Sequence, residues 1–337
     1  MKVTLIGFGN LGQGFVKSLQ EKAADFKDRY DLSIQIVAVA DINGAVIDEE
    51  GLSLEKLLSV AESGELTDFS EKSEEGKSAV EVIKEVDSDL VLELTPTDIE
   101  TGEPGLTHIK EAMKAGRNVV TSNKGPLVVA FQDLEDLARK MGVEFRYSAS
   151  VGGAIPVIGL ARNQLAGDEV NSIRGVLNGT TNYILTRMEK EGAPFDVVLR
   201  EAQELGIAEK DPTLDIEGID TAAKLVILAN ALLDRGVTLD DVDITGVTRM
   251  NPRITQLAKE TGNTIRLIGY ADSDTLEVSP RLVPVGHPLA VRGSLNAVML
   301  ETDLAREISI TGFGAGSHET SSALLGDLVD VYRSIED

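Results

Sequence analysis

The sequence predicts an α/β protein with a doubly wound parallel sheet, a second domain of mixed α/β structure, and a C-terminal helix that returns to the first domain. Three observations lead to this prediction. Short apolar strands alternate with helical segments up to residue 148, the pattern of βαβ units. Several strands separated by turns follow in the C-terminal half. A chain of 337 residues is long enough for two domains.

The first predicted strand, residues 3–6, is followed at once by the glycine-rich segment GFGNLGQG. The pattern G-x-G-x-x-G alone is weakly specific because glycine is common. Here it follows a strand and opens a helix, as a Rossmann-type dinucleotide-binding turn requires. In such a turn Gly7 would make the bend, Gly9 would let the backbone approach a pyrophosphate, and Gly12 would let the helix pack closely. The alternative is a plain glycine turn between strand and helix.

The second predicted strand, residues 34–40, ends at Asp41. An acid at this position binds the ribose hydroxyls and would repel a 2′-phosphate, so it favours NAD over NADP. The interval from the glycines exceeds the usual spacing of about 20 residues, because residues 22–33 add a polar connection. The alternative role of Asp41 is to cap the turn formed by INGA.

Two further strands end in polar segments at the edge where open α/β sheets bind ligands. Residues 90–94 precede TPTDIETGEP, and residues 118–121, which follow a helix at 108–115, lead into TSNKGP. Lys124 in this second segment is either a solvated loop lysine or a functional one. A helix at 131–141 and a strand at 144–148 complete the predicted sheet domain.

The predicted dinucleotide-binding domain comprises residues 1–132 and 311–337, and the predicted catalytic, substrate-binding and dimerisation domain comprises residues 133–310. The segment ASVGGAIPVIGLARNQ, with two glycines and a proline before a helix, marks the change between them. Strands expected at 170–177, 264–270, 276–283, 297–302 and 307–311 form a mixed sheet that could carry homodimer contacts. The segment GFGAG at 312–316 leads into an amphipathic helix, residues 320–333, and would bring its glycines near the nicotinamide.

The stretch GIAEKDPTLDIEGIDTAAKL, residues 206–225, holds the main candidates for chemistry. Asp220 and Lys224 share one helical face. The next residues, LVILANALL, are apolar nearly all round, which predicts a buried helix. Burial favours the neutral form of a lysine unless an anion compensates, so Lys224 is a candidate proton carrier, and Asp220 or Glu209 could bind a cationic substrate group. The alternative is an ordinary surface salt bridge.

The hydroxyl-rich segment NGTTNYIL has two possible interpretations. Asn178, Thr180 and Thr181 could cap the helix predicted at 183–191, or they could face a polar substrate. The three histidines lie far apart in the sequence without metal-ligand spacing, so structural or surface positions are expected for them.

Composition limits the class of protein and its environment. The absence of cysteine excludes disulfides, zinc–thiolate sites and a mechanism through a cysteine thiohemiacetal. A net charge of −24 opposes binding to nucleic acid or anionic lipid. The N-terminus lacks the apolar core of a signal peptide and no apolar run could span a bilayer, so a cytoplasmic location is expected. The acid excess, dense in residues 48–89, predicts a solvated, halophilic surface.

Taken jointly, the motifs resemble the homoserine dehydrogenase family nearly end to end. GFGNLG, LTPT, TSNKGP, YSASVGGAIPVI, LNGTTNYIL, AEKDPTLDIEGIDTAAKL and GFGAG occur in that family's order. The length matches the monofunctional form, without an aspartate kinase module. The resemblance implies NAD(P)-dependent interconversion of L-homoserine and L-aspartate 4-semialdehyde, toward threonine and methionine biosynthesis. The acidic composition adds the expectation of a halophilic archaeal source.

The resemblance also implies roles for single residues. Lys224 resembles the family's catalytic lysine and Lys124 its partner at the nicotinamide. Substrate binding falls on Glu209, Asp220, Thr180 and the adjoining Gly179. Cofactor contacts fall on Phe8, Gly9, Asn10, Leu11, Gly12, Thr95, Lys124, Gly314 and Gly316. Ser148 stands where many members have a glutamate that helps to hold a monovalent cation, which leaves the carbonyls of Val151 and Gly153 as the candidate ligands.

Three questions stay open at this level. Either lysine could make the final proton transfer, and Lys224 is favoured because a buried helix fixes geometry better than a loop does. A different amino-acid dehydrogenase with the same plan, for example one acting on aspartate, is the nearest enzymatic rival. A non-catalytic NAD-binding regulator is the rival from another class, and the presence of both lysines argues against it.

Overall fold

The chain forms two compact units, Met1–Ser150 with Gly316–Asp337 and Val151–Ala315, which are described separately. The computed structural model describes residues 1–63, 66–69 and 72–336; four residues of the acidic segment, 64, 65, 70 and 71, lie outside the described ranges. This division differs from the predicted domain ranges at both boundaries. Residues 133–150 belong to the first unit because their strand joins its sheet, and residues 311–315 belong to the second because they continue a strand of the other sheet.

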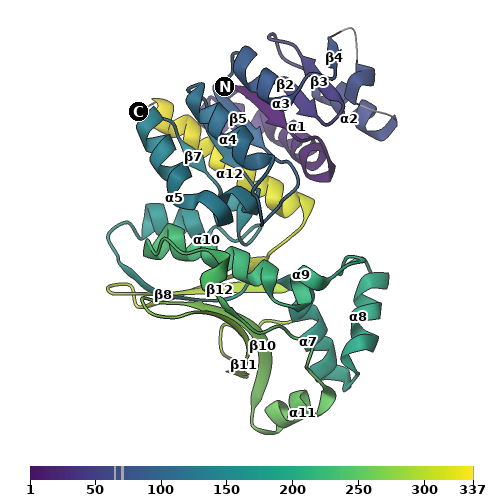
Figure 1. Ribbon diagram of the computed structural model, residues 1–337, viewed down its shortest axis with the longest axis vertical. Coiled ribbons are helices and arrows are strands. Elements are labelled where there is room, and N and C mark those ends of the chain that lie inside the picture. The colour runs from purple at the N-terminus through teal and green to yellow at the C-terminus, as the bar shows by residue number, and fades with distance from the viewer. Residues whose placement is uncertain (64–65, 70–71, 337) are drawn as a thin grey trace. The chain divides into compact units, whose positions relative to one another are not determined.

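The described part of the first unit contains a seven-stranded sheet in the order β4-β3-β2-β1-β5-β6-β7 (Figure 1). Its strands are β1 (Lys2–Ile6), β2 (Gln35–Asp41), β3 (Gly44–Ile47), β4 (Ser73–Glu75), β5 (Leu90–Glu93), β6 (Asn118–Thr121) and β7 (Phe145–Arg146). All pairs are parallel except those of β3 and β4, an edge hairpin that the sequence did not predict. The chain order reverses between β1 and β5, where doubly wound sheets bind ligands. The predicted fold class is confirmed.

Four helices of the first unit lie where helices were predicted, but the segment expected as a polar connection, residues 22–33, is helical up to Tyr30, and the acidic segment contains two helices that were not predicted. The helices of this unit are α1 (Asn10–Tyr30), α2 (Leu54–Ser63), α3 (Ala79–Glu85), α4 (Gly105–Lys114), α5 (Lys124–Met141) and α12 (Ser317–Glu336), with short turns η1 (Leu66–Phe69) and η2 (Ser148–Ser150). α5 was predicted from residue 131, but it begins at Lys124 because the Asn123 side chain accepts a hydrogen bond from Gly125 N and caps it. A kink at Ala130 separates the two parts of this helix. Within the described ranges, no helix is both long and apolar enough to cross a bilayer.

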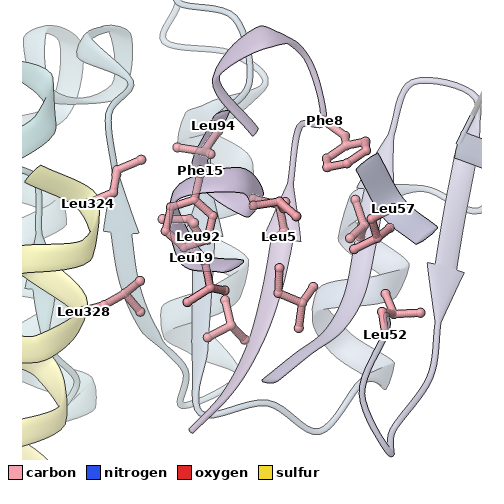
Figure 2. Close-up of a cluster of buried hydrophobic side chains, with 14 of the residues drawn as sticks. Leu5, Phe8, Phe15, Leu19, Leu52, Leu57, Leu92, Leu94, Leu324 and Leu328 are labelled. Atoms are coloured by element: carbon pink, nitrogen blue, oxygen red, sulfur yellow. The ribbon is translucent and has the colours of Figure 1, made fainter. Parts of the chain in front are cut away.

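A buried apolar cluster joins the sheet, α1 and α12 inside the first unit, and Figure 2 shows its side chains. Leu5 comes from β1, Phe15 and Leu19 from α1, and Leu324 and Leu328 from α12. Burying each such side chain stabilises the fold by about 1.5–3 kcal/mol. The C-terminal helix is therefore part of this core, as the sequence predicts.

The second unit, all of whose residues are described, is built on a mixed sheet in the order β13-β12-β8-β10-β11-β9. Its strands are β8 (Val170–Val176), β9 (Asp243–Ile244), β10 (Asn263–Ala271), β11 (Leu276–Pro284), β12 (Leu295–Thr302) and β13 (Glu307–Phe313). Its helices are α6 (Val157–Gly159), α7 (Gly179–Glu191), α8 (Phe195–Glu204), α9 (Thr213–Ile216), α10 (Ile219–Leu233) and α11 (Pro252–Glu260), with turns η3 (Leu160–Gln164) and η4 (Leu239–Asp241). α10 packs against β8 and β10 and is buried from Thr221 to Asn230, so the predicted buried helix is confirmed.

One of the buried acids of the first unit lies on α12. Asp327 on α12 is 3% exposed, and its Oδ2 accepts a hydrogen bond from Ser148 N at 2.9 Å. Burial raises the pKa of Asp327 to about 6, while the hydrogen bonds from Ser148 oppose that rise. The ionised form of this acid is therefore disfavoured in the folded protein.

Replacing Asp327 with asparagine is expected to stabilise the protein near pH 7 and to have little effect near pH 4. The pKa of Asp327 in the folded chain, about 6, lies above its ordinary value of 3.8. The buried neutral acid therefore contributes its full stability below pH 3.8, and this contribution is lost as the pH rises to about 6. The corresponding difference in unfolding free energy is about 3 kcal/mol. Denaturant unfolding of both proteins at constant salt measures it, and a stability difference that does not change with pH would contradict it.

Candidate functional site

The glycine turn after β1 brings the ends of two neighbouring strands very close together. Gly7 has φ +94°, and a Cβ atom added to it would lie 2.8 Å from the backbone carbonyl carbon of Leu94, which follows β5. A Cβ on Gly12 would lie 2.5 Å from the Gly7 carbonyl oxygen. Any larger residue at either position would push α1 or β5 away from the turn. Gly9 has open space around its missing side chain, so a ligand can approach the backbone there.

The start of α1 is suited to an anion. Gly9 is its N-cap, no side chain caps it, and its first turn carries no acidic residue. The first backbone N–H groups of a helix have no partner within the helix and attract phosphate. Asn10 is exposed and Leu11 is half-buried, so both border this helix terminus. The residues present therefore fit a dinucleotide pyrophosphate.

Asp41 and Phe8 meet beside the turn. Asp41 Oδ2 accepts a hydrogen bond from Phe8 N at 3.1 Å, and its Oδ1 accepts one from Ile42 N at 2.8 Å. The acid thus lies at the predicted end of β2 and also supports the local turn, which leads into β3 and not into a helix. The Phe8 ring lies in the core (Figure 2), and the Phe8 carbonyl accepts a hydrogen bond from Gln13 Nε2. The Phe8 side chain is therefore part of the core, and its backbone borders the glycine turn.

Thr95 follows β5, the neighbour of β1, and Lys124 follows β6, the neighbour of β5, at the same edge of the sheet. Asn123 Nδ2 donates a hydrogen bond to Thr95 O at 3.2 Å, which links the two segments. Lys124 is the first residue of α5 and is half-buried, so it is not the loop lysine that the sequence indicated. A helix now positions each of the two candidate lysines.

Lys224 and Asp220 form a nearly buried ion pair in the second unit. Lys224 Nζ lies 2.7 Å from Asp220 Oδ2 and donates a second hydrogen bond to Leu177 O at 2.8 Å. The two side chains are 10% and 13% exposed, which excludes an ordinary solvated surface pair. An ammonium group has three donors, and these two contacts leave one for another oxygen.

Asn178, between β8 and α7, organises the surroundings of this pair. Its Oδ1 accepts a hydrogen bond from Thr181 N, so it caps α7 as one of the two interpretations proposed. Its Nδ2 donates to Asp220 Oδ2 at 2.9 Å and also contacts Asp215. Sequence reasoning considered Asn178 as a cap or a substrate contact and missed that it connects two acids of the 206–225 stretch. Only the fold places a residue 42 positions away beside Asp220.

The remaining substrate candidates lie around the same helix start. Thr180 is 8% exposed and donates to Ile207 O at 3.1 Å, which brings the loop before Glu209 to α7. Glu209 itself is exposed. A Cβ on Gly179 would lie 2.9 Å from Ser294 O, so this position admits only a small residue.

The candidate cation ligands and the terminal glycine segment also meet within the second unit. A Cβ on Gly153, whose φ is +55°, would lie 2.7 Å from the Gly314 carbonyl carbon, and Ala154 N donates to Phe313 O. Val151 belongs to the same turn and is fully buried. Gly316, on the other side of the unit boundary, begins the turn into α12 with φ +134°. In the part of the chain that the structure describes, no cluster of three or more acidic, histidine or cysteine side chains could hold a metal ion.

A doubly wound sheet with an open glycine turn, together with a buried lysine–carboxylate pair in a second unit, defines the class of dinucleotide-dependent α/β oxidoreductases. Two family models match the chain: "Homoserine dehydrogenase, NAD binding domain" over residues 7–148 and "Homoserine dehydrogenase" over residues 156–329. The chain belongs to the homoserine dehydrogenase family.

Similar proteins span the whole chain. A homoserine dehydrogenase of Methanocaldococcus jannaschii is 51% identical, and the alignment covers 99% of each chain. An NAD(+)-dependent homoserine dehydrogenase of Pseudomonas canavaninivorans is 36% identical over 99% of this chain and 96% of the relative. Among solved structures, a hyperthermophilic archaeal homoserine dehydrogenase in complex with NADPH has a TM-score of 0.85 at 26% identity and covers 99% of this chain and 98% of its own.

Proposed function

We propose that this protein interconverts L-homoserine and L-aspartate 4-semialdehyde with NAD or NADP, in the biosynthesis of threonine and methionine. The family match over both units supports the reaction. The observation that carries the chemistry is the Lys224–Asp220 pair, because a nearly buried amine beside a carboxylate can hold and transfer a proton. Thr180, Gly179, Glu209 and Asp220 are the proposed substrate contacts.

The proposed mechanism assigns proton transfer to the protein. The bound dinucleotide supplies the hydride acceptor for oxidation and the donor for reduction. In the oxidation of homoserine, the neutral amine of Lys224 takes the hydroxyl proton as the hydride leaves the same carbon, which gives the aldehyde. In the reverse direction the ammonium form donates its remaining N–H to the developing alkoxide and protonates it. Lys124, at the start of α5, is proposed to assist at the nicotinamide end.

The test of this function is the change in absorbance at 340 nm when the purified protein meets homoserine with NAD⁺ or NADP⁺ in molar salt. Homoserine-dependent reduction of the dinucleotide is expected. Aspartate in place of homoserine tests the rival amino-acid dehydrogenase. Dinucleotide binding without turnover of either substrate would instead support a non-catalytic regulator.

NAD is the proposed preferred cofactor. Support comes from Asp41, whose carboxylate lies at the end of β2 next to the glycine turn and would repel a 2′-phosphate. The family does not decide the question, because one relative is described as NAD(+)-dependent and another was solved with NADPH. The ratio of kcat/KM values for NAD⁺ and NADP⁺ measures the preference.

Replacing Glu209 with leucine is expected to raise the KM for homoserine about tenfold or more and to change kcat less. The reason is the proposed contact between this carboxylate and the substrate ammonium, which would be made equally in the ground and transition states. The neighbouring exposed acid Asp211, changed to asparagine, is the matched control. An unchanged KM in the Glu209 variant would place the ammonium contact elsewhere.

The acidic surface is proposed to be an adaptation to high salt, in keeping with a halophilic source. Raising KCl from about 0.1 M to 2 M is expected to raise the thermal unfolding midpoint, because the Debye length falls from about 10 Å at 0.1 M to about 3 Å at 1 M and self-repulsion weakens. Tetramethylammonium chloride is the control. Screening is the same for both cations, whereas stabilisation by a monovalent cation bound at Val151 and Gly153 would depend on which cation is present. Greatest stability in dilute buffer would contradict the proposal.

The protein is further proposed to act as a homodimer in the cytoplasm. Leu282 near the end of β11 and Val285 just after it are 62% and 61% exposed, so a monomer would leave their apolar surface in contact with water. Sedimentation velocity in high salt gives the oligomeric state. Nucleic acid and membranes are not proposed as partners, given the charge of −24.

A further inference from the structure

Glu93, the last residue of β5, is a fully buried carboxylate that the proposed mechanism does not use. It is 0% exposed, and no lysine or arginine pairs with it in the described residues. Its Oε1 accepts hydrogen bonds from the backbone N–H of Thr95, at 3.0 Å, and from the Thr95 hydroxyl. Burying a carboxylate costs free energy unless hydrogen bonds compensate, so these bonds hold Thr95 in one position.

Glu93 also forms a hydrogen bond to the end of the neighbouring strand, β6. Thr121, the last residue of β6, lies with its Oγ1 2.9 Å from Glu93 Oε2 and 3.0 Å from the Glu93 carbonyl oxygen, and donates to one of them. The same Oγ1 accepts a hydrogen bond from Asn123 N at 3.0 Å. Asn123 in turn caps α5 through Gly125 N and donates to Thr95 O. The chain of hydrogen bonds therefore runs from Glu93 to the residue that precedes Lys124.

The first turn of α4 closes the network from the other side. A Cβ on Gly105 would lie 2.5 Å from Asn123 Nδ2 and 3.2 Å from Glu93 Oε2, so the helix packs directly on these groups. His108 on the same helix is buried, and its Nδ1 is 3.9 Å from Glu93 Oε1, beyond hydrogen-bond distance. The network is thus enclosed by α4, β5, β6 and the start of α5, all within the first unit.

We infer that Glu93 is a positioning residue for the cofactor end of the site: its hydrogen bonds hold Thr95 and, through Thr121 and Asn123, the start of α5 that carries Lys124. Glu93 itself touches neither substrate nor cofactor in this arrangement. The inference rests on the proposed function only in taking Thr95 and Lys124 as dinucleotide contacts. Groups that orient reacting residues act by reducing misplacement, and small displacements cost large factors in rate.

Glu93→Gln and Glu93→Ala separate hydrogen bonding from charge. Glutamine has the same shape, can accept from Thr95 and can donate to Thr121, so it is expected to keep the NADH dissociation constant and kcat within about threefold. Alanine removes every contact, and it is expected to raise the dissociation constant about tenfold and to lower kcat about tenfold or more. Fluorescence titration with NADH measures binding without turnover. Equal losses in both variants would overturn the positioning role.

If Glu93→Ala does not fold, a matched pair of variants, Thr121→Val and Thr4→Val, provides the test. Both threonines are 0% exposed in strands of the same sheet, but Thr4 bonds to Ser88 and not to the network. The two valine variants are expected to show similar thermal midpoints, while only Thr121→Val weakens NADH binding and lowers kcat, by about fivefold or more.

Wild-type NADH affinity and kcat in Thr121→Val would overturn the inference. A wild-type protein that binds NADH but does not oxidise homoserine would refute the proposed reaction alone, because the binding comparison would still stand.

Discussion

Replacing Lys224 with alanine is expected to lower kcat by about 100-fold or more while the NADH dissociation constant stays unchanged. The amine of Lys224 is the proposed carrier of the hydroxyl proton, and the loss of a general acid or base typically costs at least this factor. Lys224 lies in the second unit, and the glycine turn that would bind the dinucleotide lies in the first. Steady-state rates with homoserine and NADH titrations measure the two quantities independently.

Two further variants are the controls for this experiment. Lys190→Ala removes an exposed lysine from α7 in the same unit and is expected to keep wild-type turnover. Lys224→Arg keeps a positive charge but cannot release its proton near neutral pH, so it is expected to be nearly as slow as alanine. Near-normal turnover in Lys224→Ala would transfer the catalytic role to Lys124.

Replacing Asp220 with asparagine is expected to have the second largest effect, with a loss of about tenfold to 100-fold in kcat and of about 3 kcal/mol in the free energy of unfolding. The substitution keeps the shape of the side chain but leaves the ammonium of Lys224, 10% exposed, without its anion. An unpaired charge this far from solvent destabilises the fold, and the loss of the carboxylate removes the group that holds the amine in place. Chemical denaturation and steady-state kinetics at constant salt measure the two losses.

Asp215→Asn is the matched control, because Asp215 bonds to the same Asn178 amide but is not paired with Lys224. It is expected to lose little turnover. Combining Asp220→Asn with Lys224→Met should restore part of the lost stability, since removing both charges costs less than removing one. A double variant that is no more stable than Asp220→Asn would argue against a coupled pair.

The course of the chain in the first unit was largely predictable from local patterns. Apolar runs such as LVLEL and IQIVAVA have the length and composition of buried strands, and the glycines at 7, 9 and 12 suit one kind of turn. The helix after residue 219 was predictable because it has no polar face. The hairpin of β3 and β4 was not, since its residues SEE and GAVI are too short and, in one strand, too charged to show strand alternation.

The sequence alone determined the residue types of the site: a glycine turn, an acid at the end of β2, and a lysine four residues after an aspartate at the start of an apolar helix. Only the tertiary structure decided which partners they have. Asn178 reaches Asp220, Leu177 receives the Lys224 amine, and Glu93 connects the ends of β5 and β6. Helical and strand periodicity depend on neighbours within a few positions, whereas hydrogen bonds between segments far apart in sequence form only when strand pairing brings their ends to one edge of a sheet.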